Sequence, residues 1–451
     1  MLTPSRFSRR HWQLDSQQRV LRIELARRSR TVLIFARATA SRAKQARFPK
    51  GHSLKVESSS DQTPWTSIRQ KPAVRLFDTT LRDGEQSAGV HLTPPQKAIF
   101  AGQLEAAGVD VIDAGFPYAS EVDWKGVQAV AEATESVTLS AVATHLKKDI
   151  DQVRLALAGH ESRSRLATRI GPYELYRKHA DNPNIRSKLI SGSRTAVSYA
   201  KDYFPEVQYY LNYAGMRDPK FMTELSQEVA DAGATHVIVA DSQSTFTPSQ
   251  ISDFTQQLVT AVGHQAKIGV HCHNMYGMAV ANSVAAVEAG AVQVEATVGG
   301  IGDAGGNTAL EQIAMYAEVF GKNVAPWDHS FQIKAIYSLA QELTRLTGFT
   351  FASNHPLVGP DTFKIEAGIH QTQILQVNPG LAPEWIGRTA EIVLGRHSGI
   401  QGIRLKAEEL GIQTKDINWH HIYRLLMDKA ASQGMLEDRD LHDAIDQSQH
   451  E

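Results

Sequence analysis

Eight short runs of apolar and β-branched residues, spaced along the middle of this 451-residue chain, restrict its possible folds more than any other feature. Helical stretches separate most of the runs, for example residues 95–107, 219–232, 248–262 and 278–289. An open, doubly wound sheet is one possible fold, but no Gly-x-Gly-x-x-Gly follows the first run. Because eight strand–helix units in about 250 residues are typical of a TIM barrel, we predict an α/β fold of the TIM (β/α)8 class. The expected strands are residues 74–80, 109–117, 138–144, 165–171, 207–213, 235–241, 267–274 and 292–298.

The composition changes on both sides of the predicted barrel. Residues 1–70 contain 15 Lys/Arg but 4 Asp/Glu, and they are rich in Arg and Ser. We expect them to form a basic, disordered N-terminal extension; an organellar transit peptide and an upstream stretch from a wrongly chosen start are the alternatives. The barrel is expected over residues 71–325. A small helical C-terminal subdomain is expected over residues 326–451, and its polar last stretch, 437–451, should fray.

Several partners and locations are disfavoured by the sequence. The basic extension lacks interleaved aromatic residues and a recognisable binding motif, so we expect no nucleic-acid partner. No apolar run approaches the roughly 18 residues of a transmembrane helix, so we expect no membrane partner. The single cysteine, Cys272, cannot form a disulfide within one chain, which favours a reducing compartment. We predict a cytoplasmic protein, or an organellar one if residues 1–70 are a transit peptide.

Two histidines, His271 and His273, stand two positions apart in the seventh predicted strand. Residues i and i+2 of a strand point to the same face, so both imidazoles should face the barrel mouth. Asp83 follows the first strand and Asn307 follows the eighth, and both strands neighbour the seventh in a closed barrel. These oxygen and nitrogen ligands suit Mg²⁺, Mn²⁺ or Zn²⁺. We therefore predict a divalent-metal site; two hydrogen-bonded histidines without a metal are the alternative.

Two arginines are candidates for binding a substrate. Arg82 adjoins Asp83, and an arginine near a metal can hold a developing alkoxide because its charge does not titrate away. The alternative for Arg82 is a salt bridge to Asp78. Arg169 lies in the fourth predicted strand and can pair with a second anionic group of a substrate if it points into the mouth. An internal salt bridge is its alternative.

Several segments resemble one enzyme family. Residues 81–86, Leu-Arg-Asp-Gly-Glu-Gln, are similar to the first signature of the 2-isopropylmalate synthase and homocitrate synthase family, within the DRE-TIM metallolyase superfamily. Residues 271–274, His-Cys-His-Asn, resemble its second signature, and residues 299–307 resemble its glycine-rich loop. Residues 367–371 and 393–399 are similar to its C-terminal subdomain. The resemblance ends near residue 415, which leaves too little chain for the family's leucine-sensing domain.

The resemblance implies an acyltransferase that condenses acetyl-CoA with a 2-oxo acid on a metal-bearing barrel. His370 would transfer a proton from the C-terminal subdomain, across the subunits of a homodimer. Gly300 and Gly302, in the glycine-rich loop, would approach the CoA moiety. Further candidates stand at the ends of predicted strands: catalytic Asp113 and Ser242, and substrate-binding Gln86, His145, Arg169 and Asn212.

The chain departs from the family pattern around the predicted metal site. Asn212 stands where the resemblance implies a catalytic glutamate, and an amide cannot take a proton as a carboxylate does. Met275 stands where the second signature has Asp. We interpret the chain as a divergent family member that uses a different 2-oxo acid. A carbon–carbon lyase similar to HMG-CoA lyase and a non-catalytic barrel are the alternatives.

Overall fold

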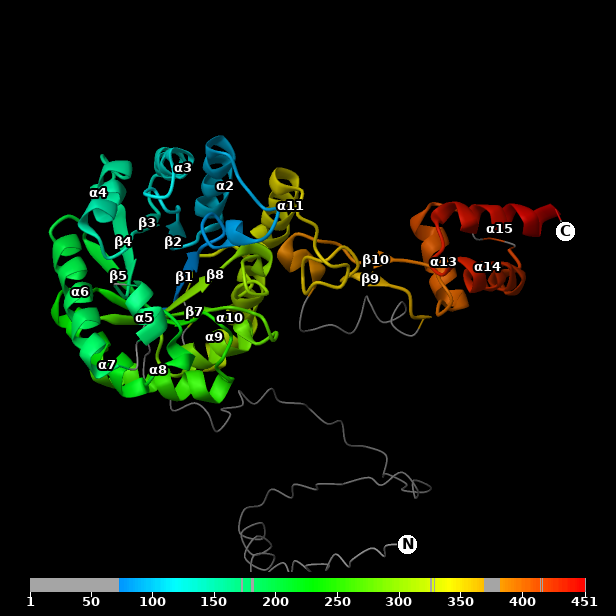
Figure 1. Ribbon diagram of the computed structural model, residues 1–451. Coiled ribbons are helices and arrows are strands. Elements are labelled where there is room, and N and C mark those ends of the chain that lie inside the picture. The colour runs from blue at the N-terminus through cyan, green and yellow to red at the C-terminus, as the bar shows by residue number, and fades with distance from the viewer. Residues whose placement is uncertain are drawn as a thin grey trace, which may run out of the picture. The chain divides into compact units, whose positions relative to one another are not determined.

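The eight predicted strands form a closed, parallel barrel in the computed structural model (Figure 1). Each strand pairs with the next, and β8 closes the ring by pairing with β1, with Arg75 opposite Gln293 and Asp78 opposite Ala296. The predicted TIM barrel is therefore confirmed. The strands are β1 Arg75–Asp78, β2 Val111–Asp113, β3 Thr138–Val142, β4 Ser164–Arg169, β5 Glu206–Leu211, β6 His236–Asp241, β7 Lys267–Cys272 and β8 Gln293–Ala296.

The structure describes residues 73–450 apart from 172, 180–181, 325–326, 328, 369–381, 414 and 416. The N-terminal extension expected over residues 1–70 lies outside the described residues. So does His370, the predicted proton-transfer residue.

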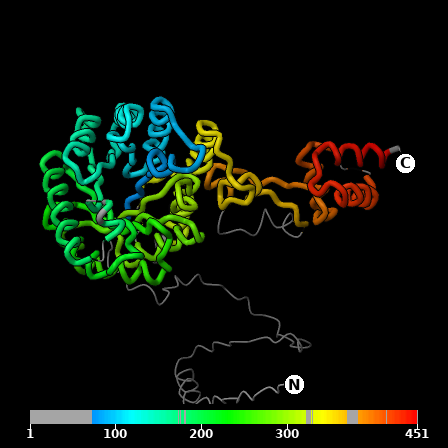
Figure 2. Tube along the Cα trace, in the orientation of Figure 1, coloured from blue at the N-terminus to red at the C-terminus, as the bar shows by residue number. Residues whose placement is uncertain are grey.

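At least one helix follows each strand, and the helices surround the barrel as the chain passes once around it (Figure 2). The start of α8 shows how the sequence sets a helix boundary. The Thr247 hydroxyl accepts from the backbone N–H of Gln250, the Gln250 side chain accepts from the backbone N–H of Thr247, and Pro248 stands first in the helix. The surrounding helices are α2 Pro94–Ala107, α3 Glu121–Glu132, α4 Lys147–Ala156, α5 Tyr173–His179, α6 Pro183–Lys201, α7 Pro219–Asp231, α8 Pro248–Val262, α9 Ala279–Glu288 and α10 Leu310–Val324.

The apolar core between strands and helices continues beyond β8 and α10 into α11 (Ile336–Thr347). Leu339 and Leu343 of α11 are buried in the same cluster as Leu104 of α2. The division at residue 325 stays a prediction, but the buried core does not end there. After α11, β9 (Lys364–Ile365) pairs with β10 (Glu391–Ile392) in a small two-stranded sheet.

The last three described helices, α13 (Ile400–Glu409), α14 (Trp419–Gln433) and α15 (Asp438–His450), form a second apolar core. The expectation that residues 437–451 fray is wrong, because residues 438–450 form α15. Its composition is polar, yet Leu441, Ala444 and Ile445 recur at helical spacing and are buried. That short apolar stripe is what anchors the helix.

A polar cluster fills the barrel interior near the N-terminal ends of the strands. Arg165 of β4 is fully buried, and its Nε donates to Glu206 Oε2 at 2.8 Å. Its Nη1 donates to Gln208 at 3.0 Å and to Gln293 at 2.7 Å. His236 of β6 lies 3.4 Å from Nη2 of the same arginine. We refer to these five residues as the lower cluster.

Candidate active site

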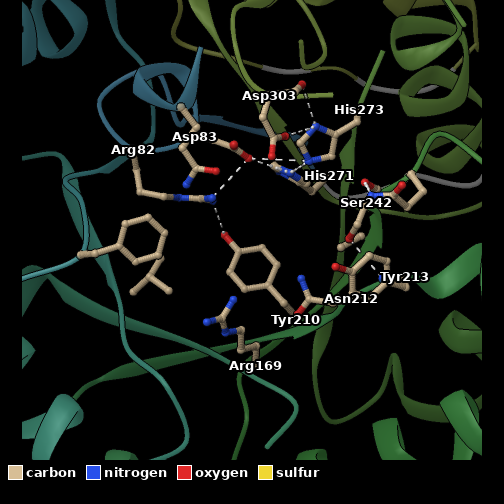
Figure 3. Close-up of a pocket in the computed structure, with 15 residues that line it drawn as sticks. Arg82, Asp83, Arg169, Tyr210, Asn212, Tyr213, Ser242, His271, His273 and Asp303 are labelled. Atoms are coloured by element: carbon tan, nitrogen blue, oxygen red, sulfur yellow. Dashed lines mark hydrogen bonds and ion pairs between the residues drawn. The ribbon is translucent and has the colours of Figure 1, made fainter. Parts of the chain in front are cut away.

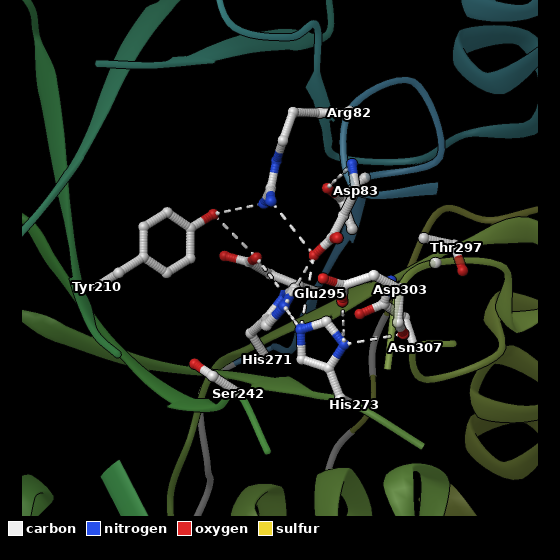
Figure 4. Close-up of polar contacts among 12 residues, drawn as sticks. Arg82, Asp83, Tyr210, Ser242, His271, His273, Glu295, Thr297, Asp303 and Asn307 are labelled. Carbon is white, nitrogen blue, oxygen red and sulfur yellow. Dashed lines mark hydrogen bonds and ion pairs between the residues drawn. The ribbon is translucent and has the colours of Figure 1, made fainter. Parts of the chain in front are cut away.

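The residues predicted to bind a metal meet at the C-terminal ends of β1, β7 and β8. After β1 the chain turns sharply, and the backbone N–H groups of Arg82 and Asp83 both donate to Thr79 O. This turn aims the Asp83 side chain across the barrel mouth. His271 points inward from β7, and His273 forms an isolated backbone bridge with Asn307 just beyond the strand. The segments that contain these residues therefore lie together at the barrel mouth, and Figure 4 shows their side chains.

The Asp83, His271 and His273 side chains have the spacing that a cation needs. One ligand atom from each lies within 4.8 Å of the other two, and all three residues are buried. His271 Nε2 lies 3.0 Å from Asp83 Oδ2 and 3.3 Å from His273 Nε2. Asn307 Oδ1 is buried and has no hydrogen-bond partner among the described residues, while its Nδ2 donates to Ile301 O. A carboxylate, two imidazole nitrogens and a spare amide oxygen fit a divalent cation.

Two carboxylates that the sequence interpretation missed hold the histidines in place. His271 Nδ1 lies 3.0 Å from Glu295 Oε2, and His273 Nδ1 lies 3.1 Å from Asp303 Oδ1. With Nδ1 of each ring engaged, both Nε2 atoms face the centre of the cluster. Partners of this kind orient histidine ligands in metal sites. Glu295 was recognisable as an acidic residue inside the eighth strand, two positions after Gln293 and therefore on the same inward face.

The close charges of the cluster shift the pKa values of its members. Burial alone would raise the pKa of Asp83, but Arg82 and His271 outweigh burial and hold the pKa of this carboxyl well below its usual value. Burial would lower the pKa of His271, but hydrogen bonds to Asp83 and Glu295 raise it to about 9. A proton shared by Asp83 and His271 would have to leave before a cation could bind both, so metal binding is expected to release a proton.

Arg82 pairs with residues other than Asp78, the partner considered from the sequence. Arg82 Nε donates to Asp113 Oδ2 at 2.7 Å, and Nη1 lies 3.2 Å from Asp83 Oδ2. Asp78 instead accepts from the hydroxyl and backbone N–H of Thr80. Arg82 is thus fixed beside the candidate metal ligands. Asp113, predicted as catalytic, is fully buried behind it and acts on the guanidinium.

A cavity of about 200 Å³ opens beside the cluster (Figure 3). Most of its lining is polar, and the apolar side chains in it are those of Phe116, Val142 and Ala240. Tyr210 projects from β5 toward Arg82 and also lines the cavity, a position that the sequence interpretation missed. The lining residues are Arg82, Asp83, Gln86, Phe116, Val142, Arg169, Tyr210, Asn212, Tyr213, Ala240, Ser242, Gln243, His271, His273 and Asp303.

The cavity therefore brings together most, but not all, of the predicted site residues. Four of the predicted catalytic and substrate-binding residues line it beside Arg82: Gln86, Arg169, Asn212 and Ser242. Five others are absent from the described lining: Asp113, His145, Gly300, Gly302 and Asn307. His145 instead lies against Gly171, where a Cβ would come within 2.0 Å of its ring. Its substrate-binding role stays a prediction.

The glycines of the loop after β8 shape the backbone around Asn307. Gly300 has φ 64° and Gly302 has φ 154°, and a Cβ on Gly302 would lie 2.1 Å from Asn307 Nδ2. A side chain at Gly302 would therefore displace the candidate metal ligand. Contact of Gly300 and Gly302 with CoA stays a prediction.

Two family descriptions match consecutive parts of the chain: HMGL-like over residues 73–343 and homocitrate synthase post-HMGL domain-like over residues 357–434. A 2-isopropylmalate synthase of Geobacillus sp. is 35% identical over 375 residues, covering 82% of this chain and 72% of that protein. Another from Pyrococcus abyssi is 36% identical over 380 residues, covering 82% and 77%. The chain belongs to the 2-isopropylmalate synthase and homocitrate synthase family. The family assignment made from the sequence is therefore confirmed, and so is the prediction that the chain is an acyltransferase.

Solved structures add a fold likeness to the family assignment. An HMG-CoA lyase of Bacillus subtilis matches with a TM-score of 0.52 at 18% identity, covering 62% of this chain and 96% of that one. The enzyme of Pseudomonas aeruginosa matches with a TM-score of 0.52 at 19% identity, covering 62% and 95%. At this identity the likeness concerns the barrel alone. Among the described helices, none combines the length and hydropathy needed to cross a membrane.

Proposed function

We propose that this family member is a metal-dependent, Claisen-type acyltransferase that condenses acetyl-CoA with a 2-oxo acid to give a 2-substituted malate or a homocitrate-like product, plus CoA. The observation that carries the proposal is the convergence of Asp83, His271 and His273 with Arg82 at the mouth of the barrel. The curated relatives, which are 2-isopropylmalate synthases, point to the same chemistry.

Mg²⁺, Mn²⁺ or Zn²⁺ would be held by Asp83, His271 and His273, with Asn307 completing the set, and would act as a Lewis acid toward the 2-oxo acid. Arg82 would donate to the carbonyl oxygen and stabilise the negative charge that develops there as the new carbon–carbon bond forms. Asp113 holds Arg82 in place at 2.7 Å. The guanidinium is therefore aimed before the substrate arrives.

The condensation also requires removal of a proton from the acetyl methyl group and hydrolysis of the thioester. The Asn212 amide in the cavity cannot accept that proton. We retain His370 as the proton-transfer residue, reaching the site across a homodimer. Mixing the inactive variants His370→Ala and Asp83→Ala tests this: activity should return in mixed dimers if each subunit supplies one group, and should stay absent otherwise.

Arg169 and the polar lining favour a 2-oxo acid with a second anionic group. Arg169 lines the same cavity as Asn212 and Ser242. Removing a charge-assisted hydrogen bond loses about 1.5–3 kcal/mol, so Arg169→Ala should raise KM for an anionic 2-oxo acid about 10- to 150-fold. KM for an alkyl 2-oxo acid should change far less. Equal effects on both substrates would contradict the role.

Asn212 stands where the resemblance implies a catalytic glutamate, so absence of the condensation is the outcome that would most directly contradict the proposal. The test is release of free thiol from acetyl-CoA with a panel of 2-oxo acids, using metal-depleted and metal-reconstituted protein. Thiol that appears only with a 2-oxo acid and a metal supports the synthase. Thiol without a 2-oxo acid indicates a hydrolase. No turnover with any pair, despite bound metal, would contradict the proposal.

A further inference from the structure

Tyr210 closes a ring of side-chain contacts around the candidate metal site (Figure 4). Arg82 Nη1 lies 3.2 Å from Asp83 Oδ2, which lies 3.0 Å from His271 Nε2. His271 Nδ1 lies 3.0 Å from Glu295 Oε2, to which the Tyr210 hydroxyl donates at 2.9 Å. The same hydroxyl accepts from Arg82 Nη2 at 3.4 Å. Tyr210 therefore links the predicted catalytic arginine with the carboxylate behind a metal ligand.

The strand geometry explains why this tyrosine, and not its neighbour, belongs to the site. Successive side chains of β5 alternate between the inside and the outside of the barrel. Tyr210 and Asn212 point inward and line the cavity. Tyr209 is equally buried but points outward, where its hydroxyl donates to Ser193 Oγ of α6 at 2.6 Å. Of the two tyrosines, only Tyr210 reaches Arg82 and Glu295.

The Tyr210 hydroxyl and the Arg82 guanidinium can both donate a hydrogen bond to the same atom in the cavity. Both side chains line the cavity, and the contact between them, at 3.4 Å, is the longest in the ring. An oxygen atom placed between Arg82 and Tyr210 on the cavity side would be within hydrogen-bond reach of both. A tyrosine hydroxyl hydrogen rotates to suit its partner, so it can turn from Glu295 to such an oxygen. Hydrogen-bond donors, neutral or charged, stabilise a developing oxyanion when the protein holds them in place before the reaction.

We propose that Tyr210 is a catalytic residue of this site: together with Arg82, its hydroxyl donates a hydrogen bond to the carbonyl oxygen of the bound 2-oxo acid and stabilises the negative charge that forms on it. No proton leaves the tyrosine in this role. The inference rests on the proposed function, because the oxygen in question belongs to the 2-oxo acid. It adds a donor that neither the sequence signatures nor the family descriptions assign.

The test compares Tyr210→Phe with Tyr209→Phe, which removes an equally buried hydroxyl from the other face of the same strand. Each variant is reconstituted with metal, and thiol release gives kcat and KM for the 2-oxo acid. Calorimetry gives the dissociation constants of the metal and of the 2-oxo acid, and thermal unfolding gives Tm. Loss of one oxyanion donor typically lowers kcat by about 10²- to 10³-fold. We expect that loss in Tyr210→Phe, with the metal dissociation constant and KM changed by less than about threefold, whereas Tyr209→Phe keeps its kcat.

Three results would overturn the inference. A kcat of Tyr210→Phe equal to that of Tyr209→Phe would show that the hydroxyl does not act on the substrate. A fall in kcat that is matched by lost metal affinity would show that Tyr210 only positions His271 through Glu295. Absence of thiol release by the wild-type protein with every 2-oxo acid would instead reject the proposed function itself, and the role of Tyr210 with it.

Discussion

The two ends of the barrel each contain an arginine in a buried polar network, but the two networks are completed differently. In the lower cluster, Arg165 is fully buried and its donors reach Glu206, Gln208 and Gln293. None of the buried side-chain nitrogen or oxygen atoms of the lower cluster lacks a partner among the described residues. At the mouth, the buried oxygens Asp113 Oδ1, Asn212 Oδ1 and Asn307 Oδ1 have no partner among them.

This difference indicates that the lower network serves stability and that the mouth serves function. Buried polar atoms are nearly always satisfied, so unsatisfied ones call for an explanation such as a ligand. The lower network is closed by protein alone and holds the strands together. The mouth keeps hydrogen-bonding and coordinating capacity for a cation and a substrate. TIM barrels generally bind substrates at this C-terminal face.

Among these tests, removing the metal should have the largest effect on the mouth of the barrel. A chelator, or the substitution His273→Ala, should reduce thiol release to background, because the cation loses its ligands. The metal should stabilise the wild-type protein by about 2.7 kcal/mol at a concentration of 100 times its dissociation constant. Denaturant unfolding with and without metal measures this. Equal stabilisation of His273→Ala by the metal would place the cation elsewhere.

Substituting Arg165 and Arg82 in turn tests whether the two ends of the barrel serve different roles. Arg165→Met should lower the free energy of unfolding by about 3 kcal/mol, because it leaves Glu206 without its charged partner and the Gln293 oxygen without its donor. Its kcat per folded molecule should stay within about threefold of wild type. The matched variant Arg82→Met should also destabilise, since Asp113 stays buried, but its kcat should fall about 10²- to 10³-fold. A large loss of kcat in Arg165→Met would contradict the division between the two ends.

The sequence revealed the mouth better than the lower cluster for a physical reason. Asp83, His271 and His273 form short motifs whose chemistry is legible without a structure, and the strand count places them at one end of a barrel. Tyr210 acts through its contact with Glu295, which lies 85 residues away in the chain, and no local pattern signals that contact. The same holds for Arg165 and Gln293, which are 128 residues apart. Register across a closed sheet decides such pairs, and only the fold supplies it.

Per pH unit, acid should produce the smallest effect, and it should act on the lower cluster. Burial lowers the pKa of His236 to about 2, and the neighbouring charges of Arg165, Lys267 and Arg75 add to the shift. Below its ordinary pKa of about 6.5, the unfolded chain therefore binds a proton that the folded protein does not, and stability should fall as the pH is lowered from about 6.5 toward 2. The slope from this one residue is at most about 1.4 kcal/mol per pH unit. His236→Gln should remove that slope from the pH dependence of denaturant unfolding while leaving metal binding unchanged, and an unaltered slope would show that the lower cluster tolerates the extra charge.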